Sequence, residues 1–209
     1  MNFNKSPHEQ VSTFTVLKKK GKMKNIVLSL AVLVACTSAT PSYEPATPTA
    51  GTHKSIHEFK VPSIEGGTID FSKFKGKKIL VVNTASKCGY TPQYDGLEKL
   101  YKEHKDKLVI VGFPANNFGG QEPGTNDEIK EFCKVRFGVS FPLAAKVDVV
   151  GDNTDPLFKW LTQKEENGVL DATIKWNFTK FLLDENGKLL ASFPSKVTPD
   201  SEEIMAYLK

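Results

Sequence analysis

The sequence predicts an α/β domain with a central mixed sheet and helices on both of its faces. Two apolar, β-branched runs, at 78–84 and 108–113, are typical of strands buried on both faces. Segments with helical periodicity follow each of them. Near the C-terminus, Asn186-Gly187 between two further apolar runs is typical of a β-hairpin. Strands that alternate with helices and then end in a hairpin combine parallel and antiparallel pairing in one sheet.

The first elements lie just after residue 53. Alternating runs at 59–61 and 68–71, with Gly66-Gly67 between them, predict a hairpin. The buried strand 78–84 comes next, and a loop at 85–92 follows it. After this loop we expect a helix, because Leu97, Leu100 and Tyr101 recur on one helical face.

The second buried strand leads into a long loop rich in Asn, Gly and Pro that ends at Gly124. Thr125 and Glu128, three residues apart, form the sequence pattern of a capping box, so a helix is expected to begin there. Ile129, Phe132 and Cys133 lie within that helix.

The remaining elements complete the domain. A short helix is expected at 156–163, the hairpin strands at 178–184 and 188–193, and a closing helix at 198–208. Because crossover connections are right-handed, the first two buried strands should be parallel. This order of elements is thioredoxin-like.

The composition limits the classes of protein to consider. The chain has 209 residues, of which 39% are apolar and 25% charged, as in an ordinary soluble protein. These values exclude a collagen-like chain, a fully disordered chain and a membrane protein with several spans. Three cysteines are too few for a small domain held together by disulfides.

The net charge of +4 belongs to the N-terminal segment. Residues 1–35 contain six lysines and one acidic residue, whereas residues 36–209 contain 22 basic and 23 acidic residues. The predicted domain is therefore nearly neutral, and nothing in its charge favours nucleic acid as a partner.

Residues 1–35 have the pattern of a leader peptide, in which Met23 offers a second start. The mostly apolar run 26–35 would span about 15 Å as a helix, half of a bilayer core, which favours a signal peptide over a membrane span. Leu33-Val34-Ala35-Cys36 resembles a bacterial lipobox, which predicts a lipid anchor on Cys36 and a place in the exported cell envelope, on the periplasmic side. An ordinary leader with a chance cysteine is the alternative.

Residues 36–52 are small and polar and predict a flexible tether, so the domain is expected at 53–209. We therefore divide the chain into leader, tether and one folded domain.

Cys88 is the first candidate for chemistry, since it lies between a buried strand and a helix. The positive end of the helix dipole and the adjacent Lys87 both favour a thiolate, which is a nucleophile. The alternative is a small buried residue with no reactivity. A dithiol reductase would carry a second cysteine at position 91, where this chain has Thr91.

Three segments together resemble the glutathione peroxidase family. They are the active-site loop NTASKCGYTPQY at 83–94, the second signature FGGQEPG at 118–124 and the third, KWNFTKF, at 175–181. They occur in the family's order, and the resemblance extends over residues 53–209. It implies a thioredoxin-like fold, which the order of elements predicts independently.

The resemblance also implies the roles of the site residues. The catalytic nucleophile would be Cys88, in place of selenocysteine, and Gln121, Trp176 and Asn177 would surround it. Their N–H groups can donate hydrogen bonds to a thiolate or to the oxygens of a peroxide. The implied function is reduction of hydrogen peroxide and of organic or lipid hydroperoxides in response to oxidative stress, without a cofactor. Singly, each residue has an alternative structural role, as loop, core or strand-start residue.

Cys133 matches the resolving cysteine of the thioredoxin-dependent members of the family. On this resemblance Cys88 would become a sulfenic acid, Cys133 would form a disulfide with it, and a thioredoxin-like protein would reduce that disulfide. Simple packing on the helix is the alternative for Cys133. Because the two Cα atoms of a disulfide lie within about 7 Å, we expect the helix at 125–137 to unwind partly in each cycle.

The choice of reductant and the oligomeric state follow from two departures. The chain lacks the long insertion near residues 141–148 that resembles a subunit contact in the tetrameric, glutathione-using enzymes, which favours a monomer or weak dimer. Arg136 is the single arginine of the sequence, so no arginine cluster for glutathione is present, although lysines could replace it. Glutathione stays as the alternative reductant.

Two other functions stay open: a thioredoxin-like disulfide reductase of the cell envelope, and a peroxide-sensing relay that passes oxidation to a partner. No metal site is expected, because the four histidines make no ligand pattern with the cysteines. They are His8, His53, His57 and His104.

Overall fold

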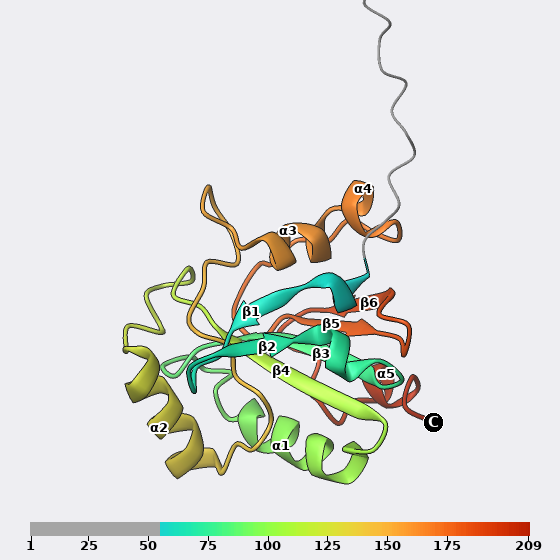
Figure 1. Ribbon diagram of the computed structural model, residues 1–209. Coiled ribbons are helices and arrows are strands. Elements are labelled where there is room, and N and C mark those ends of the chain that lie inside the picture. The colour runs from blue at the N-terminus through green and yellow to red at the C-terminus, as the bar shows by residue number, and fades with distance from the viewer. Residues whose placement is uncertain (1–54) are drawn as a thin grey trace, which may run out of the picture. The chain divides into compact units, whose positions relative to one another are not determined.

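A four-stranded sheet with the strand order β4-β3-β5-β6 forms the centre of the computed structural model, which describes residues 55–209 (Figure 1). Strands β3 (Lys78–Thr84) and β4 (Leu108–Pro114) are parallel. Strand β5 (Lys180–Leu183) is antiparallel to β3, and β6 (Leu189–Phe193) is antiparallel to β5. The predicted mixed sheet, with its parallel first pair and its C-terminal hairpin, is confirmed.

The central strand β3 separates two apolar cores. Ile79 and Val81 belong to one core, and Leu80 and Val82 belong to the other. Successive side chains of a strand point to opposite faces, so a run that is apolar at every position fills both cores. The interpretation of this run as a strand buried on both faces is confirmed.

Helices cover both faces of the sheet, as Figure 1 shows for α1 and α3 on opposite sides. The core that contains Leu80 also receives side chains from α1 (Gln93–His104), α2 (Asn126–Phe137) and α5 (Glu202–Met205). The opposite core receives the buried residues of α3 (Pro156–Thr162), which α4 (Lys164–Asn167) follows along the chain. The predicted arrangement of helices on both faces is therefore correct.

A separate hairpin precedes the central sheet. Strands β1 (Lys60–Pro62) and β2 (Thr68–Asp70) pair antiparallel, between the short 3₁₀ helices η1 (Ile56–Glu58) and η2 (Phe71–Phe74). Gly66 and Gly67, in the connecting turn, have φ angles of 86° and 75°. Glycine adopts this left-handed conformation at little cost, so the Gly-Gly pair fits the turn that it predicts.

Helix α2 begins with the predicted capping box. The backbone N–H of Glu128 donates to the Thr125 hydroxyl at 3.3 Å, and the backbone N–H of Thr125 donates to the Glu128 carboxylate at 2.7 Å. The Thr125 N–H and the Thr125 hydroxyl both donate to the Glu128 carboxylate, and they hold the pKa of Glu128 below its ordinary value. At the other end of the helix, Gly138 is a left-handed cap with φ of 60°. Both ends of α2 are therefore well defined.

The closing helix is shorter than the sequence pattern predicts. Instead of a helix over 198–208, the chain forms turns around the single short helix α5. Two contacts account for this: Ser201 N–H donates back to the Thr198 carbonyl, which closes a turn, and Pro199 makes a tertiary contact with α1 beside Gly96. The prediction of a helix over that whole segment is wrong.

The outer edge of β4 is covered by the segment 141–147. Gly112 N–H donates to the Pro142 carbonyl at 3.0 Å, and Ala144 N–H donates to the Gly112 carbonyl at 2.8 Å. Ile64, after β1, donates to the Leu143 carbonyl at 3.0 Å, so the same segment joins the hairpin to the sheet. An uncovered edge strand favours pairing with another chain, and this segment takes up part of that edge.

The predicted leader, the tether and the lipid attachment site Cys36 lie outside the residues that the structure describes. Among the helices of residues 55–209, none combines the length and the apolar character that a membrane crossing requires.

Candidate active site

Cys88 lies four residues after the end of β3 and five before the first residue of α1. Its side chain is only 8% exposed. The backbone N–H of Tyr90 donates to Cys88 Sγ at 3.4 Å, the one hydrogen bond to this sulfur that residues 55–209 provide. A backbone donor favours the anionic form of the group that accepts its bond, so this contact is suited to a thiolate.

Thr91 holds the loop at the position where a dithiol reductase has its second cysteine. The Thr91 hydroxyl accepts a hydrogen bond from the Cys88 N–H at 3.0 Å and donates to the Ala85 carbonyl at 2.8 Å. Both bonds lie in the buried interior of the loop. Thr91 thus fixes the conformation of the loop that carries the nucleophile and supplies no second thiol.

The structure brings Gln121 and Asn177 together although they are 56 residues apart in sequence. The Asn177 side-chain amide donates to Gln121 Oε1 at 3.0 Å, and Asn177 is fully buried. Gln121 is joined in turn to the cysteine loop, because the Lys87 N–H donates to its backbone carbonyl at 3.0 Å. Of the four predicted catalytic residues, Cys88, Gln121 and Asn177 therefore lie on segments that are linked by hydrogen bonds, and Trp176 is the fourth.

Asn83, at the end of β3, positions the segment that carries Trp176 and Asn177. Its Oδ1 accepts from the Thr179 N–H at 2.9 Å, and its Nδ2 donates to the Trp176 carbonyl at 3.3 Å. Phe178 lies between Asn177 and Thr179 and has a positive φ of 64°. Every other non-glycine residue among residues 55–209 has a negative φ. A bulky residue adopts this conformation only when its surroundings impose it.

Trp176 is the most exposed of the four predicted catalytic residues, at 38%. Its ring packs against that of Phe118 at a centroid distance of 5.7 Å. Gly119 lies beside it: a Cβ at that glycine would come within 3.7 Å of the indole and 3.8 Å of the Gln121 amide nitrogen. The indole and the Gln121 amide therefore approach the same glycine. The expected donation from Gln121, Trp176 and Asn177 to the thiolate itself stays a prediction.

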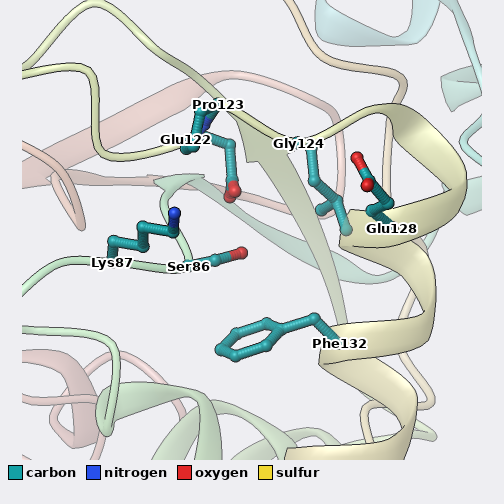
Figure 2. A pocket seen from close by; sticks show the side chains of 8 residues that line it. Ser86, Lys87, Glu122, Pro123, Gly124, Glu128 and Phe132 are labelled. Carbon is teal, nitrogen blue, oxygen red and sulfur yellow. The ribbon is translucent and has the colours of Figure 1, made fainter.

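A cavity of about 400 Å³ lies between the cysteine loop and α2 (Figure 2). The side chain of Glu122, next to Gln121, is 1% exposed and points into it, facing Ser86. Burial raises the pKa of this carboxyl above its ordinary value, and the polar groups of Ser86 partly offset that effect. Phe132 of α2 forms the apolar side of the cavity.

Cys133 is completely buried on α2, in the same apolar core as Cys88. Both are free thiols. Burial raises the pKa of Cys133 to about 11, while the nearby Tyr94 hydroxyl acts in the opposite direction. Cys133 is therefore held as a protonated thiol in this state.

No three His, Cys, Asp or Glu side chains within residues 55–209 lie close enough together to hold a metal ion.

Three buried polar residues near the site had no role in the sequence analysis: Asn83, Glu122 and Lys180. The sequence around each of them contains a signal that could have indicated its position. Asn83 is a polar residue near the end of an otherwise apolar strand, and Lys180 is a charged residue beside the apolar run 181–183. Glu122 lies inside the second signature, where a charged residue is expected to be solvated.

The family model for glutathione peroxidase matches residues 56–162. The chain is 48% identical over 148 residues to the glutathione peroxidase homolog BsaA of Staphylococcus epidermidis, which covers 70% of this chain and 93% of that protein. The chain belongs to the glutathione peroxidase family.

Other family members agree with this assignment. The glutathione peroxidase-like peroxiredoxin 2 of Saccharomyces cerevisiae is 45% identical over 157 residues, covering 74% of this chain and 97% of that protein. The crystal structure of GPX1 from T. cruzi has a TM-score of 0.58 at 34% identity, over 74% of this chain and 94% of that one. The thioredoxin-like fold and the resemblance found in the sequence are both confirmed.

As a glutathione peroxidase-family protein, the chain is a peroxidase that reduces hydroperoxides.

Proposed function

We propose that this protein is a two-cysteine thiol peroxidase in which Cys88 attacks the peroxide and Cys133 resolves the product. The observation that carries the proposal is the connection between Cys88 and its predicted partners. Lys87, beside the nucleophile, donates to the Gln121 backbone, and the Gln121 side chain accepts from Asn177. Hydrogen bonds thus link the segments that carry Cys88, Gln121 and Asn177, which supports the proposal.

In the first step the Cys88 thiolate attacks one oxygen of the hydroperoxide. The S–O bond forms as the O–O bond breaks, Cys88 is oxidised to a sulfenic acid, and the other oxygen leaves with a proton as water or an alcohol. The amide groups of Gln121 and Asn177 and the indole N–H of Trp176 would stabilise the charge on the leaving oxygen. The half-exposed Trp176 supports access of the peroxide from that side.

In the second step the Cys133 sulfur attacks the Cys88 sulfenic acid, and a disulfide and water are formed. Its complete burial and raised pKa support a sequence in which α2 opens before this attack. Opening would take Cys133 out of the environment that holds it as a thiol, so that the thiolate forms when Cys88 is already oxidised.

The reductant proposed for the disulfide is a thioredoxin-like protein, with glutathione as the alternative. Support comes from relatives that are named glutathione peroxidase-like peroxiredoxins, including those of Saccharomyces cerevisiae and Schizosaccharomyces pombe. The short connection at 141–147, which packs against β4, also favours an open site that a protein can approach.

The proposed substrates are hydrogen peroxide and organic or lipid hydroperoxides, in defence against oxidative stress. One relative, 46% identical over 158 residues, is named hydroperoxy fatty acid reductase in Synechocystis. This name supports a test of fatty acid hydroperoxides beside hydrogen peroxide.

We also propose that the protein is a monomer or weak dimer. The support is the coverage of the β4 edge by residues 141–147.

We further propose that the protein is exported and anchored by a lipid on Cys36. The support is the order of basic residues, apolar run and Cys36 in the sequence. Mass spectrometry of the mature N-terminus tests the anchor: an acylated Cys36 is expected, and a free N-terminus at another residue would contradict it.

Turnover with excess reductant tests the function. The protein should consume peroxide with thioredoxin and thioredoxin reductase much faster than with glutathione, and Cys88→Ser should abolish both activities. Insulin reduction is the control for a disulfide reductase. Reduction of insulin without consumption of peroxide would contradict the proposal.

A further inference from the structure

Lys180 is a buried amine that the proposed reaction does not use. It is the first residue of β5 and has no exposed surface. It pairs in register with Val82 of β3 and Phe193 of β6, both of which belong to the core that contains Cys88. Since residues directly opposite one another share a face of the sheet, the Lys180 side chain points into that core.

The Lys180 ammonium makes one hydrogen bond, at 2.8 Å, to the backbone carbonyl of Phe178. It takes part in none of the ion pairs formed within residues 55–209. Burial alone lowers the pKa of this amine to about 7. A lysine is rarely buried without a partner, because the charge loses its hydration.

The carbonyl that Lys180 holds belongs to the one left-handed non-glycine residue among residues 55–209. Phe178 directly follows Asn177, and its own N–H donates to the Asn83 carbonyl at 2.6 Å. The peptide unit before Phe178 is thus held by the Asn83 carbonyl of β3. The unit after it is held by the Lys180 amine at its carbonyl and by the Asn83 side chain at its N–H. This fixes the direction in which Asn177 presents its amide to Gln121.

We propose that Lys180 is a positioning residue for the reaction with peroxide, which holds the Phe178 carbonyl and thereby keeps the Asn177 amide directed at the site of Cys88. This inference rests on the proposed function, in which Asn177 acts on the peroxide. Lys180 itself contacts no reacting atom.

The test is a double-mutant cycle on the peroxide step. In Cys133→Ser protein, which isolates that step, rapid quenching and mass spectrometry give the rate at which Cys88 is oxidised by hydrogen peroxide. Lys180→Met keeps the apolar length of the side chain and removes the donor. We expect it to slow the step by about tenfold, the effect of the loss of one buried hydrogen bond. In Asn177→Ala protein the same change should have an effect of less than about twofold, because the group it positions is absent.

Two controls distinguish a positioning role of Lys180 from a general loss of stability. Lys188→Met removes an exposed lysine of the same hairpin and should leave the rate unchanged. In protein that retains Cys133, Lys180→Met should leave the later rate of disulfide formation unchanged. The proposal is overturned by any of three results. Cys88 of the Lys180→Met protein is oxidised at the rate of the parent protein; Lys180→Met slows this oxidation as much in Asn177→Ala protein as in the parent; or it slows Cys88 oxidation and disulfide formation equally.

A further measurement keeps Lys180 in place, for the case in which Lys180→Met does not fold. With ¹⁵N-labelled lysine, the Nζ resonance of Lys180 should shift on Asn177→Ala, whereas that of Lys188 should not. An unshifted Lys180 resonance would contradict the coupling. Failure of the unaltered protein to react with peroxide would instead contradict the proposed function, so the two failures are distinguishable.

Discussion

At the scale of single residues, the two cysteines of the domain lie in different surroundings. Cys88 lies on a loop, where a backbone N–H donates to its sulfur. Cys133 lies in the core, where burial raises the pKa of its thiol to about 11. The proposed resolving thiol is thus kept protonated in this state, and the proposed cycle requires the structure to change before it reacts.

The state of Cys133 predicts a dependence of stability on pH. The pKa of Cys133 rises from its ordinary value of 9.0 to about 11 on folding, so between these values the unfolded chain has lost a proton that the folded chain retains. Stability from this group is therefore full below pH 9 and is lost as the pH rises towards 11. Relative to Cys133→Ala, the unaltered protein should lose about 2 kcal/mol over that range.

Urea unfolding of both proteins at several pH values measures this difference. Groups remote from Cys133 are present in both proteins and cancel to first order. Tyr94, whose pKa is raised by burial and by Cys133 itself, is replaced by Phe in both proteins. A constant difference between pH 8 and 11 would contradict the buried thiol described here.

At the scale of elements, α2 combines two requirements. Its capping box and its left-handed C-terminal cap define the helix in the reduced protein. The proposed cycle nevertheless requires it to open, because a thiol that is fully buried on a packed helix cannot approach another loop. The cavity beside Phe132 leaves space along one side of this helix (Figure 2). The stability of α2 should therefore set the rate of disulfide formation.

Removal of the N-terminal cap of α2 tests this relation. Thr125→Ala should destabilise the helix by about 1 kcal/mol and accelerate disulfide formation after peroxide treatment by about fivefold. Asp155→Ala, which removes the side-chain cap of α3, is the matched control, because Asp155 accepts from the Leu157 N–H at 2.9 Å. It should lower stability without changing that rate. Equal rates in both variants would argue against opening of α2 as the limiting step.

At the scale of the whole molecule, the fold depends on close contact between the sheet and the segment that covers its edge. Gly112 of β4 has no space for a side chain: an added Cβ would lie 2.6 Å from Leu143 and 3.3 Å from Phe141. The backbone bonds between Gly112 and residues 142–144 require this approach.

Gly112→Ala should therefore destabilise the protein by about 1–3 kcal/mol, the usual effect of overpacking. It should also increase self-association, since displacement of the covering segment exposes an edge strand. Urea unfolding and analytical ultracentrifugation measure the two effects. Gly89→Ala is the control for stability, because an added Cβ there meets nothing within 4 Å. A Gly112→Ala protein as stable as this control would contradict the packing.

The sequence predicts the fold where local pattern and tertiary environment agree. The apolar run of β3 and the capping box of α2 are both local, and both predictions are correct. The closing helix was overestimated because its turns depend on packing of Pro199 against α1, which no local pattern reveals. The positions of Lys180 and Glu122 were missed for the same reason, since charged residues are expected at the surface unless the fold buries them.

The site follows the same division. The loop of Cys88 could be located from the strand before it and the helix after it, and the family resemblance indicates its partners. The contact between Gln121 and Asn177 could not be predicted from their spacing in the sequence. It depends on the sheet and on the hydrogen bonds of the Asn83 side chain, which hold the segment that carries Asn177.

The most direct test of the two-cysteine account is the state of both thiols after one turnover. Reduced protein is mixed with equimolar hydrogen peroxide, quenched with an alkylating reagent and digested for peptide mass spectrometry. We predict a Cys88–Cys133 disulfide, and a Cys88 sulfenic acid in its place in the Cys133→Ser variant. Oxidised Cys88 beside an alkylated Cys133, or an unreacted Cys88, would contradict the account.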